Sequence, residues 1–348
     1  MKKKKSLSSI KEIINDAKKG KIFILVDDKN RENEGDLVIP ASKCSSKKIN
    51  FMAKHGRGLI CLALTQKRVK KLSLPLMSSI NKSRTQTAFT VSIEAKKGIS
   101  TGISTKDRAK TIKVAINKSS TKKDIVSPGH IFPLVAKPGG VLERAGHTEA
   151  SVDISKLARL NPSSVICEVM NEDGTMARYQ NLIQFAKKHK LKIAKIEDLI
   201  SYRLKNEKLI KLISNKKINI SKFGHFDLKT FRNKLDGSEH FVITKGKFNK
   251  SKPARVRVIS TNLLNSVFNL NKNIYKSSLK YLSSFNNFAL ILIKNSNLDF
   301  DSSKNIKILR YYGVGAQIIK ELNIKRMILV SRSKKRIIAL KGYGIKIV

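Results

Sequence analysis

The sequence has few cysteines. Its 348 residues contain only Cys44, Cys61 and Cys167, which stand far apart. Three scattered cysteines are too few for a disulfide framework or for a four-ligand zinc site. We therefore expect a cytoplasmic protein that binds no zinc.

Long hydrophobic runs are also missing. Apolar runs such as Phe288 to Ile293 are far shorter than the roughly 20 residues that span a membrane. Lys2 to Lys5 resemble the basic start of a secretion signal, but the apolar stretch that such a signal needs does not follow. Instead, apolar residues recur at helical spacing between Leu7 and Ala17, which predicts an amphipathic helix. We expect no membrane partner.

Acidic residues are scarce: 25 Asp and Glu face 72 Lys and Arg, a net charge of +47. Such an excess favours nucleic-acid binding, because a basic face releases counterions from phosphates. The charge is nevertheless spread, with 41 basic and 18 acidic residues in 1–203 and 31 and 7 in 204–348. Lys, Asn and Ile also occur together at high frequency throughout the chain, which is typical of a codon bias toward A and T. We expect no specific nucleic-acid partner, and generic attraction to polyanions remains the alternative.

The length and the 41% of hydrophobic residues favour two packed domains. Short β-branched runs mix with helical patterns, without the regular βαβ rhythm of a doubly wound sheet, so we expect an α+β fold. The helical patterns cover residues 47–54, 105–117, 178–189 and 196–205. We interpret the Lys/Asn/Ile-rich segment 204–220 as a linker helix between a domain at 1–203 and a second at 221–348.

A first candidate group is the loop Arg31 to Asp36, in which Glu32, Glu34 and Asp36 alternate with other residues. An extended backbone aims such carboxylates to one side, where they repel one another. Water, the neighbouring Arg31 or a hard divalent cation would offset that repulsion. A solvated acidic turn is the alternative interpretation.

A second group lies in Gly-rich and apolar segments. His130 follows Pro128-Gly129, and His147 lies between Arg144 and Glu149, beside Thr148. These residue types combine phosphate binding with acid/base chemistry, although for each histidine alone a structural hydrogen bond is the favoured interpretation. Glu168 stands in an apolar strand, where a carboxylate is costly unless it is paired, working or facing solvent. Cys61 suits a buried apolar position, with lining of the site as the lesser alternative.

These motifs resemble 3,4-dihydroxy-2-butanone-4-phosphate synthases from about residue 6 to Arg203. The resemblance rests on Asp27-Asp28, Arg31-Glu32-Asn33-Glu34-Gly35-Asp36, Ser127-Pro128-Gly129-His130, Gly140-Val141-Leu142, Arg144-x-Gly146-His147-Thr148-Glu149-Ala150, Glu168 and Asn171-x-Asp173-Gly174-Thr175-Met176-Ala177-Arg178.

The resemblance implies a homodimeric lyase. It implies conversion of D-ribulose 5-phosphate to L-3,4-dihydroxy-2-butanone 4-phosphate and formate, in riboflavin biosynthesis, with Mg2+ or Mn2+. By position it implies that Glu32 and His147 bind the metal and that His130 and Glu168 are catalytic. The substrate-binding residues that it implies are Arg31, Glu32, Asp36, Arg144, Ala145, Gly146, His147, Thr148 and Glu168.

Residues 221–348 resemble GTP cyclohydrolase II. The likeness rests on Phe223-Gly224-x-Phe226, Lys234-Leu235-Asp236-Gly237-x-Glu239-His240, Val256-Arg257-Val258, Tyr312-Gly313-Val314-Gly315-Ala316-Gln317-Ile318 and Gly342-Tyr343-Gly344-Ile345. That family holds a zinc on three cysteines, yet no cysteine follows Cys167, and Asn262, Asn273 and Tyr275 take the ligand positions. We therefore expect a degenerate, inactive domain, and a bifunctional enzyme is the alternative.

Overall fold

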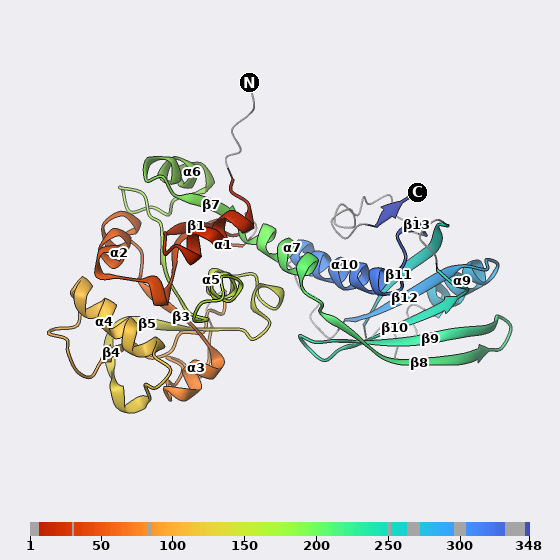
Figure 1. Cartoon of the computed structure of the whole chain (residues 1–348), viewed down its shortest axis with the longest axis horizontal. Helices are drawn as coiled ribbons and strands as arrows, with labels where there is room; N and C mark the ends of the chain where they lie inside the picture. Colours follow the sequence, from red (N-terminus) through yellow and green to blue (C-terminus); the bar gives the residue numbers. More distant parts are fainter. Residues whose placement is uncertain are drawn as a thin grey trace, which may run out of the picture. The chain divides into compact units, whose positions relative to one another are not determined.

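The computed structural model describes residues 7–29, 31–82, 85–248, 252–262, 272–295, 304–330 and 345–348. The chain divides into two compact units, Met1–Ile200 and Ser201–Val348 (Figure 1). Each unit combines helices with a seven-stranded sheet, which confirms the α+β fold class. No helix among the described residues is long and apolar enough to cross a membrane.

The first unit is built on a mixed sheet in the order β4-β5-β3-β6-β2-β1-β7. β1 pairs antiparallel with β2 and parallel with β7, and β3 pairs parallel with β5. Its strands are β1 (Phe23–Val26), β2 (Gly35–Pro40), β3 (Cys61–Thr65), β4 (Ile93–Ala95), β5 (Ile125–Ala136), β6 (Ser164–Glu168) and β7 (Lys192–Lys195). The helices are α1 (Ile10–Lys18), α2 (Ser46–Phe51), α3 (Gln66–Lys71), α4 (Thr105–Ile116), α5 (His147–Leu157), α6 (Tyr179–Lys188) and α7 (Ile196–Asn206), which runs into the second unit.

The amphipathic helix expected near the start of the chain is α1. Ser9 caps it: its hydroxyl accepts from the Glu12 backbone, and the Glu12 carboxylate accepts from the Ser9 backbone N–H in return. This capping box satisfies N–H groups that a helix start otherwise leaves without acceptors. Ile10, Ile13 and Ala17 form the buried face. The apolar spacing thus sets which side of α1 packs inward.

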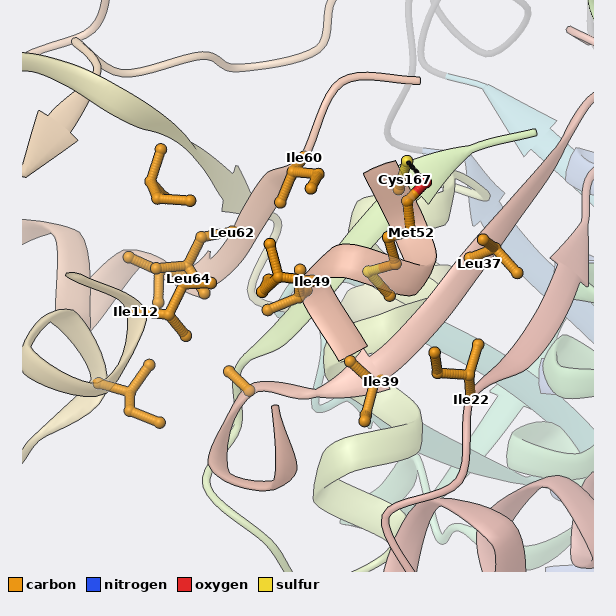
Figure 2. Close-up of a cluster of buried hydrophobic side chains, with 14 of the residues drawn as sticks. Ile22, Leu37, Ile39, Ile49, Met52, Ile60, Leu62, Leu64, Ile112 and Cys167 are labelled. Carbon is orange, nitrogen blue, oxygen red and sulfur yellow. Dashed lines mark hydrogen bonds between the residues drawn. The ribbon is translucent and has the colours of Figure 1, made fainter. Parts of the chain in front are cut away.

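Buried aliphatic side chains form the core of the first unit (Figure 2). The labelled residues come from strands β2, β3 and β6, from helices α2 and α4, and from residues directly next to such elements: Ile22, Leu37, Ile39, Ile49, Met52, Ile60, Leu62, Leu64, Ile112 and Cys167. Cys167 is fully buried, and its thiol faces the Met52 carbonyl at 3.7 Å. Burying each large aliphatic side chain contributes about 1.5–3 kcal/mol. This core fixes the strands from whose ends the functional loops project.

The second unit has its own sheet, in the order β14-β13-β11-β12-β10-β9-β8. Strands β8 to β10 and β12 pair antiparallel, whereas β11 to β14 are joined by parallel pairings. Its elements are β8 (Ile210–Ile220), β9 (Gly224–Asn233), β10 (Glu239–Lys245), β11 (Ala254–Asn262), α9 (Lys272–Ser283), β12 (Phe288–Asn295), α10 (Lys304–Glu321), β13 (Arg326–Leu329) and β14 (Lys346–Ile347).

The predicted linker helix over 204–220 is wrong. Helix α7 ends at Asn206, and residues 210–220 form strand β8. β8 pairs antiparallel with the next strand, β9, with one irregularity between Leu212 and Ser214. This strand pairing overrides the weak local pattern. Ile218 and Ile220 pack against the buried cluster around Phe226.

The three positions that align with zinc ligands belong to two different elements. Asn262 ends β11, while Asn273 and Tyr275 belong to α9. In the Tyr312 motif, the glycines fall within α10. Residues 342–344 of the last motif lie outside the described residues.

Candidate active site

A cavity of about 650 Å3 opens in the first unit. It lies between the β1–β2 loop, the start of α5, the end of β6 and the segment that precedes β4. The predicted site residues that line it are Arg31, Glu32, Asp36, Arg144, His147, Thr148 and Glu168. Ala145 and Gly146 are buried between two of these lining residues. The structure thus brings together nearly every residue that the sequence singled out.

The β1–β2 loop is held in place by Asp27, directly after β1. One carboxylate oxygen accepts from Arg31 Nη1 at 2.8 Å and from the Glu32 backbone at 3.1 Å, and the other accepts from the Glu34 backbone at 2.9 Å. Asn33 takes up the left-handed conformation at φ 56°, which asparagine tolerates better than most residues. The acidic loop is therefore built around a buried anchor, unlike a freely solvated turn.

Charges concentrate where this loop meets α5. His147 Nδ1 lies 3.8 Å from Glu32 Oε2 and 3.7 Å from Asp36 Oδ1. Burial raises the pKa of Glu32, but the neighbouring charges of Arg31 and His147 outweigh it and lower that pKa to about 2. Burial lowers the pKa of His147, but the carboxylates of Asp36 and Glu32 raise it to about 9.

Asp36 behaves in the opposite way from Glu32. Burial, together with the charges of Glu168 and Glu32, raises its pKa to about 7 against the opposing effect of His147. Glu32 of the loop and Asp36 of β2 therefore differ in protonation: Glu32 stays ionised, while Asp36 exchanges its proton near neutral pH.

The residues around His147 fit a hard divalent cation. Within the described part of the chain, His147 Nε2 is buried and has no hydrogen-bond partner. Ligand atoms of Asp27, Glu32 and His147 all lie within 4.8 Å of one another. Carboxylate oxygens with one imidazole suit Mg2+ or Mn2+. The sequence analysis assigned Asp27 no role, although its place directly after a buried strand was a signal for one.

Arg144 and Lys137 line the same cavity next to the start of α5, and we call this part of the lining the cationic wall. Arg144 donates through Nη1 to Glu149 (2.7 Å) and through Nη2 to the Thr85 carbonyl (3.0 Å) and the Thr87 hydroxyl (2.8 Å). Thr148 lies in the first turn of α5, where backbone N–H groups lack intrahelical acceptors. Guanidinium, hydroxyl and helix start together suit a phosphate group.

Glu168 closes the cavity from the end of β6. It pairs in register with Asp36, and its Oε2 accepts from the Leu59 backbone at 2.8 Å. The close approach requires Gly58, because a Cβ there would stand 2.6 Å from the Glu168 carboxylate. Cys61 also lines the cavity, and burial, together with Glu168 and Asp36, raises the pKa of its thiol.

His130 is the one predicted catalytic residue that does not line this cavity. It lies on β5, half-exposed, and its Nδ1 contacts the carboxylate of Glu94 on β4. Its place in the same Gly-rich stretch of sequence as His147 does not bring the two rings into one pocket within the chain.

Comparisons with known proteins place both halves of the chain. The family model of 3,4-dihydroxy-2-butanone 4-phosphate synthase matches residues 11–202. The model of GTP cyclohydrolase II matches residues 211–295 and 296–348.

Relatives extend over nearly the whole length. A 3,4-dihydroxy-2-butanone 4-phosphate synthase of Photobacterium phosphoreum is 44% identical, over 99% of this chain and 98% of that protein. The riboflavin biosynthesis protein RibBA of Aquifex aeolicus is also 44% identical, over 98% and 91%.

Solved structures are also similar to this chain, one of them over nearly its whole length. RibBX, a two-domain 3,4-dihydroxy-2-butanone 4-phosphate synthase from A. baumannii, superposes with a TM-score of 0.84 at 40% identity, covering 98% of this chain and 99% of that one. A synthase in complex with two magnesium ions has a TM-score of 0.55 at 36% identity, covering 57% of this chain and 98% of that one.

Proposed function

The chain belongs to the 3,4-dihydroxy-2-butanone 4-phosphate synthase family, and from that premise we propose that it converts D-ribulose 5-phosphate to L-3,4-dihydroxy-2-butanone 4-phosphate and formate in riboflavin biosynthesis. The observation that carries the proposal is one cavity with an acidic, imidazole-bearing wall and a cationic wall. A sugar phosphate presents the matching groups, an anionic end and an end rich in hydroxyl groups.

The cavity orients the substrate by charge. Its phosphate lies against Arg144, Thr148 and the start of α5, which directs the ketone and hydroxyl groups toward Glu32, Asp36 and His147. Arg31, Ala145 and Gly146 complete the substrate contacts. Glu32 and His147 would hold Mg2+, or Mn2+ in its place, and such a cation would supply Lewis-acid polarisation of the ketone and so acidify the neighbouring C–H.

Proton transfer falls to the chain's own groups. The two products together contain the atoms of the substrate, so the reaction needs a carbon–carbon rearrangement and proton movements but no oxidant. Asp36 both accepts and donates a proton near neutral pH because its pKa is about 7. Glu168 lies beside it in register and serves as a second acid/base group.

His130 reaches the reaction from a second copy of the chain in this proposal. Its ring lies outside the cavity of its own chain. Val126, an apolar side chain that is 42% exposed, lies four residues before His130 on β5 and pairs with Glu94. A homodimer that covers this edge of the sheet would bring His130 of one copy to the cavity of the other.

Mixed dimers test this arrangement. Co-expression of His130→Ala with Glu168→Gln gives heterodimers in which one site carries both changes and the other carries neither. Recovery of activity in the mixture supports sharing between copies. Mixed dimers that stay inactive place both groups in one chain.

The second unit lacks the cyclohydrolase activity in this proposal. No cysteine follows Cys167 in the sequence, and neither asparagine nor tyrosine replaces a thiolate on zinc. The alternative, a bifunctional enzyme, draws support from the RibBA relatives. Stoichiometric zinc in the purified protein, together with formate release from GTP, would establish the alternative.

One assay decides the main activity. Purified full-length protein is given ribulose 5-phosphate with Mg2+, with Mn2+ and with EDTA, and formate and the four-carbon product are measured. We expect both products with either metal and neither with EDTA. Absence of both products in every condition would refute the proposed function. We propose a cytoplasmic location, which suits three free cysteines, and no specific nucleic-acid partner.

A further inference from the structure

Glu94 and His130 form a carboxylate–imidazole pair outside the cavity. Glu94 Oε1 contacts His130 Nδ1, and the glutamate side chain is only 15% exposed, against 44% for the histidine. A largely buried carboxylate is costly unless it finds a hydrogen-bonding partner. The more buried Glu94 thus holds the more exposed His130 ring in place.

The pairing of β4 with β5 creates this contact. Ile93 pairs with Ile131 but the next residue, Glu94, pairs with Val126, so residues 127–130 project out of the ladder. Bulges of this kind redirect side chains near functional sites. The Ser-Pro-Gly-His segment is therefore a local insertion that returns the His130 ring over Glu94.

Two glycines leave room for the pair. A Cβ on Gly129 would stand 2.2 Å from the Ile93 carbonyl carbon, and one on Gly102 would stand 1.7 Å from Glu94 Oε1. Gly102 also has φ +87°, and its N–H donates to the Asp107 carboxylate at 3.2 Å. The backbone therefore packs directly onto the Glu94 carboxylate and keeps it under the ring.

We infer that Glu94 is the positioning residue of His130: its carboxylate holds the proton on Nδ1 and so leaves Nε2 free to act on the substrate. The inference rests on the proposed catalytic role of His130. A carboxylate that binds one ring nitrogen fixes both the tautomer and the orientation of an imidazole. Glu94 itself touches no substrate in this arrangement.

A double-mutant cycle separates this role from a merely structural one. Glu94→Gln keeps the size of the side chain but replaces the ionised acceptor with an amide. We expect kcat to fall about 10- to 100-fold, by analogy with the loss of a carboxylate that orients a metal-bound histidine, and KM to stay within twofold. In a His130→Ala background the same change should have no further effect, because the group through which it acts is gone.

Two controls complete the experiment. Glu172→Gln, at a side chain that is 82% exposed, should leave kcat unchanged, and Glu94→Asp should recover part of the loss because it restores the negative charge. The imidazole nitrogen NMR shifts of His130 should show a tautomer change in Glu94→Gln.

The outcomes distinguish the two proposals. Equal losses from Glu94→Gln in the His130→Ala and wild-type backgrounds would overturn the pairing alone. Near wild-type turnover by His130→Ala would overturn the catalytic role of His130 and this inference with it, while the synthase activity itself would stand.

Discussion

Arg144 Nη1 donates to Glu149 Oε2 across 2.7 Å, and the second oxygen of the same carboxylate accepts from the Lys137 backbone at 3.1 Å. Glu149 is only 1% exposed. One buried carboxylate thus fixes the guanidinium and the adjoining backbone on the cationic wall of the cavity. Its two oxygens must both be acceptors.

Glu149→Gln should therefore weaken substrate binding. An amide has one acceptor oxygen, so its NH2 group would face either the Arg144 guanidinium or the Lys137 N–H. A lost hydrogen bond to a charged group costs about 1.5–3 kcal/mol. We expect KM for ribulose 5-phosphate to rise at least about tenfold in steady-state assays. Glu143→Gln, at a nearby exposed glutamate, should change little; an unaltered KM in Glu149→Gln would contradict the assigned role.

Glu168→Gln should abolish formate release without unfolding the protein. The amide oxygen can still accept from the Leu59 backbone, but the side chain no longer takes up a proton. Loss of a general acid/base group costs about 10²–10⁴-fold in rate. Formate release gives the rate, and thermal unfolding within about 2 °C of wild type checks the fold. Turnover close to normal would refute the catalytic role of Glu168.

In metal-free buffer, stability should fall between pH 7 and 9. Folding raises the pKa of His147 from its ordinary 6.5 to about 9. Its charged form therefore stabilises the fold fully below pH 6.5, and this contribution is lost as the pH rises through 9. We expect the thermal midpoint to drop by a few degrees, and the size and midpoint of the drop to change in His147→Asn, where Asp36 alone of this pair still titrates.

Saturating Mg2+ should reduce this drop, because a metal needs the neutral imidazole and its binding releases the proton. Apparent Mg2+ affinity should accordingly increase from pH 7 to 9. The same pH dependence in wild type and His147→Asn would show that other groups cause it.

Gly35→Ala should destabilise the first unit. Gly35 begins β2, and a Cβ there would stand 2.6 Å from Leu182 Cδ1 on α6. Both residues are buried, and forcing a methyl group into a packed core costs about 1–3 kcal/mol. Thermal unfolding measures the loss. Gly174→Ala is the comparison: its Cβ meets nothing within 4 Å, so only the cost of its positive φ remains, about 1–2 kcal/mol, and no packing cost is added. Gly35→Ala as stable as wild type would contradict the packing argument.

Local patterns predicted the helices well and one strand badly. The pattern at 105–117 corresponds to α4, which the Ser104 side chain caps, and the pattern at 178–189 corresponds to α6. Helical periodicity and caps are local, so the sequence displays them. Strand β8 depends on its pairing with β9, and no pattern within 210–220 specifies that partner.

The site residues, too, were only partly predictable from the sequence. Resemblance to a family, and not residue chemistry alone, connected Glu32 with His147, because their meeting depends on where the β1–β2 loop lies relative to α5. Glu94 was not among the predicted site residues, because a lone glutamate in a short strand belongs to no motif. Lys137 was indistinguishable in a chain with so many lysines, although it lines the cavity.

The thiols of this protein are chemically quiet. Burial raises the pKa of Cys44 to about 12 and also raises the pKa of Cys61 and Cys167, which lie near the Asp36 and Glu168 carboxylates. Oxidants and alkylating agents attack the thiolate, which is then almost absent at neutral pH. The acidic surroundings that serve a sugar phosphate thus also protect Cys61, in the cavity wall, from oxidative damage. Purification without a reducing agent should leave the synthase intact.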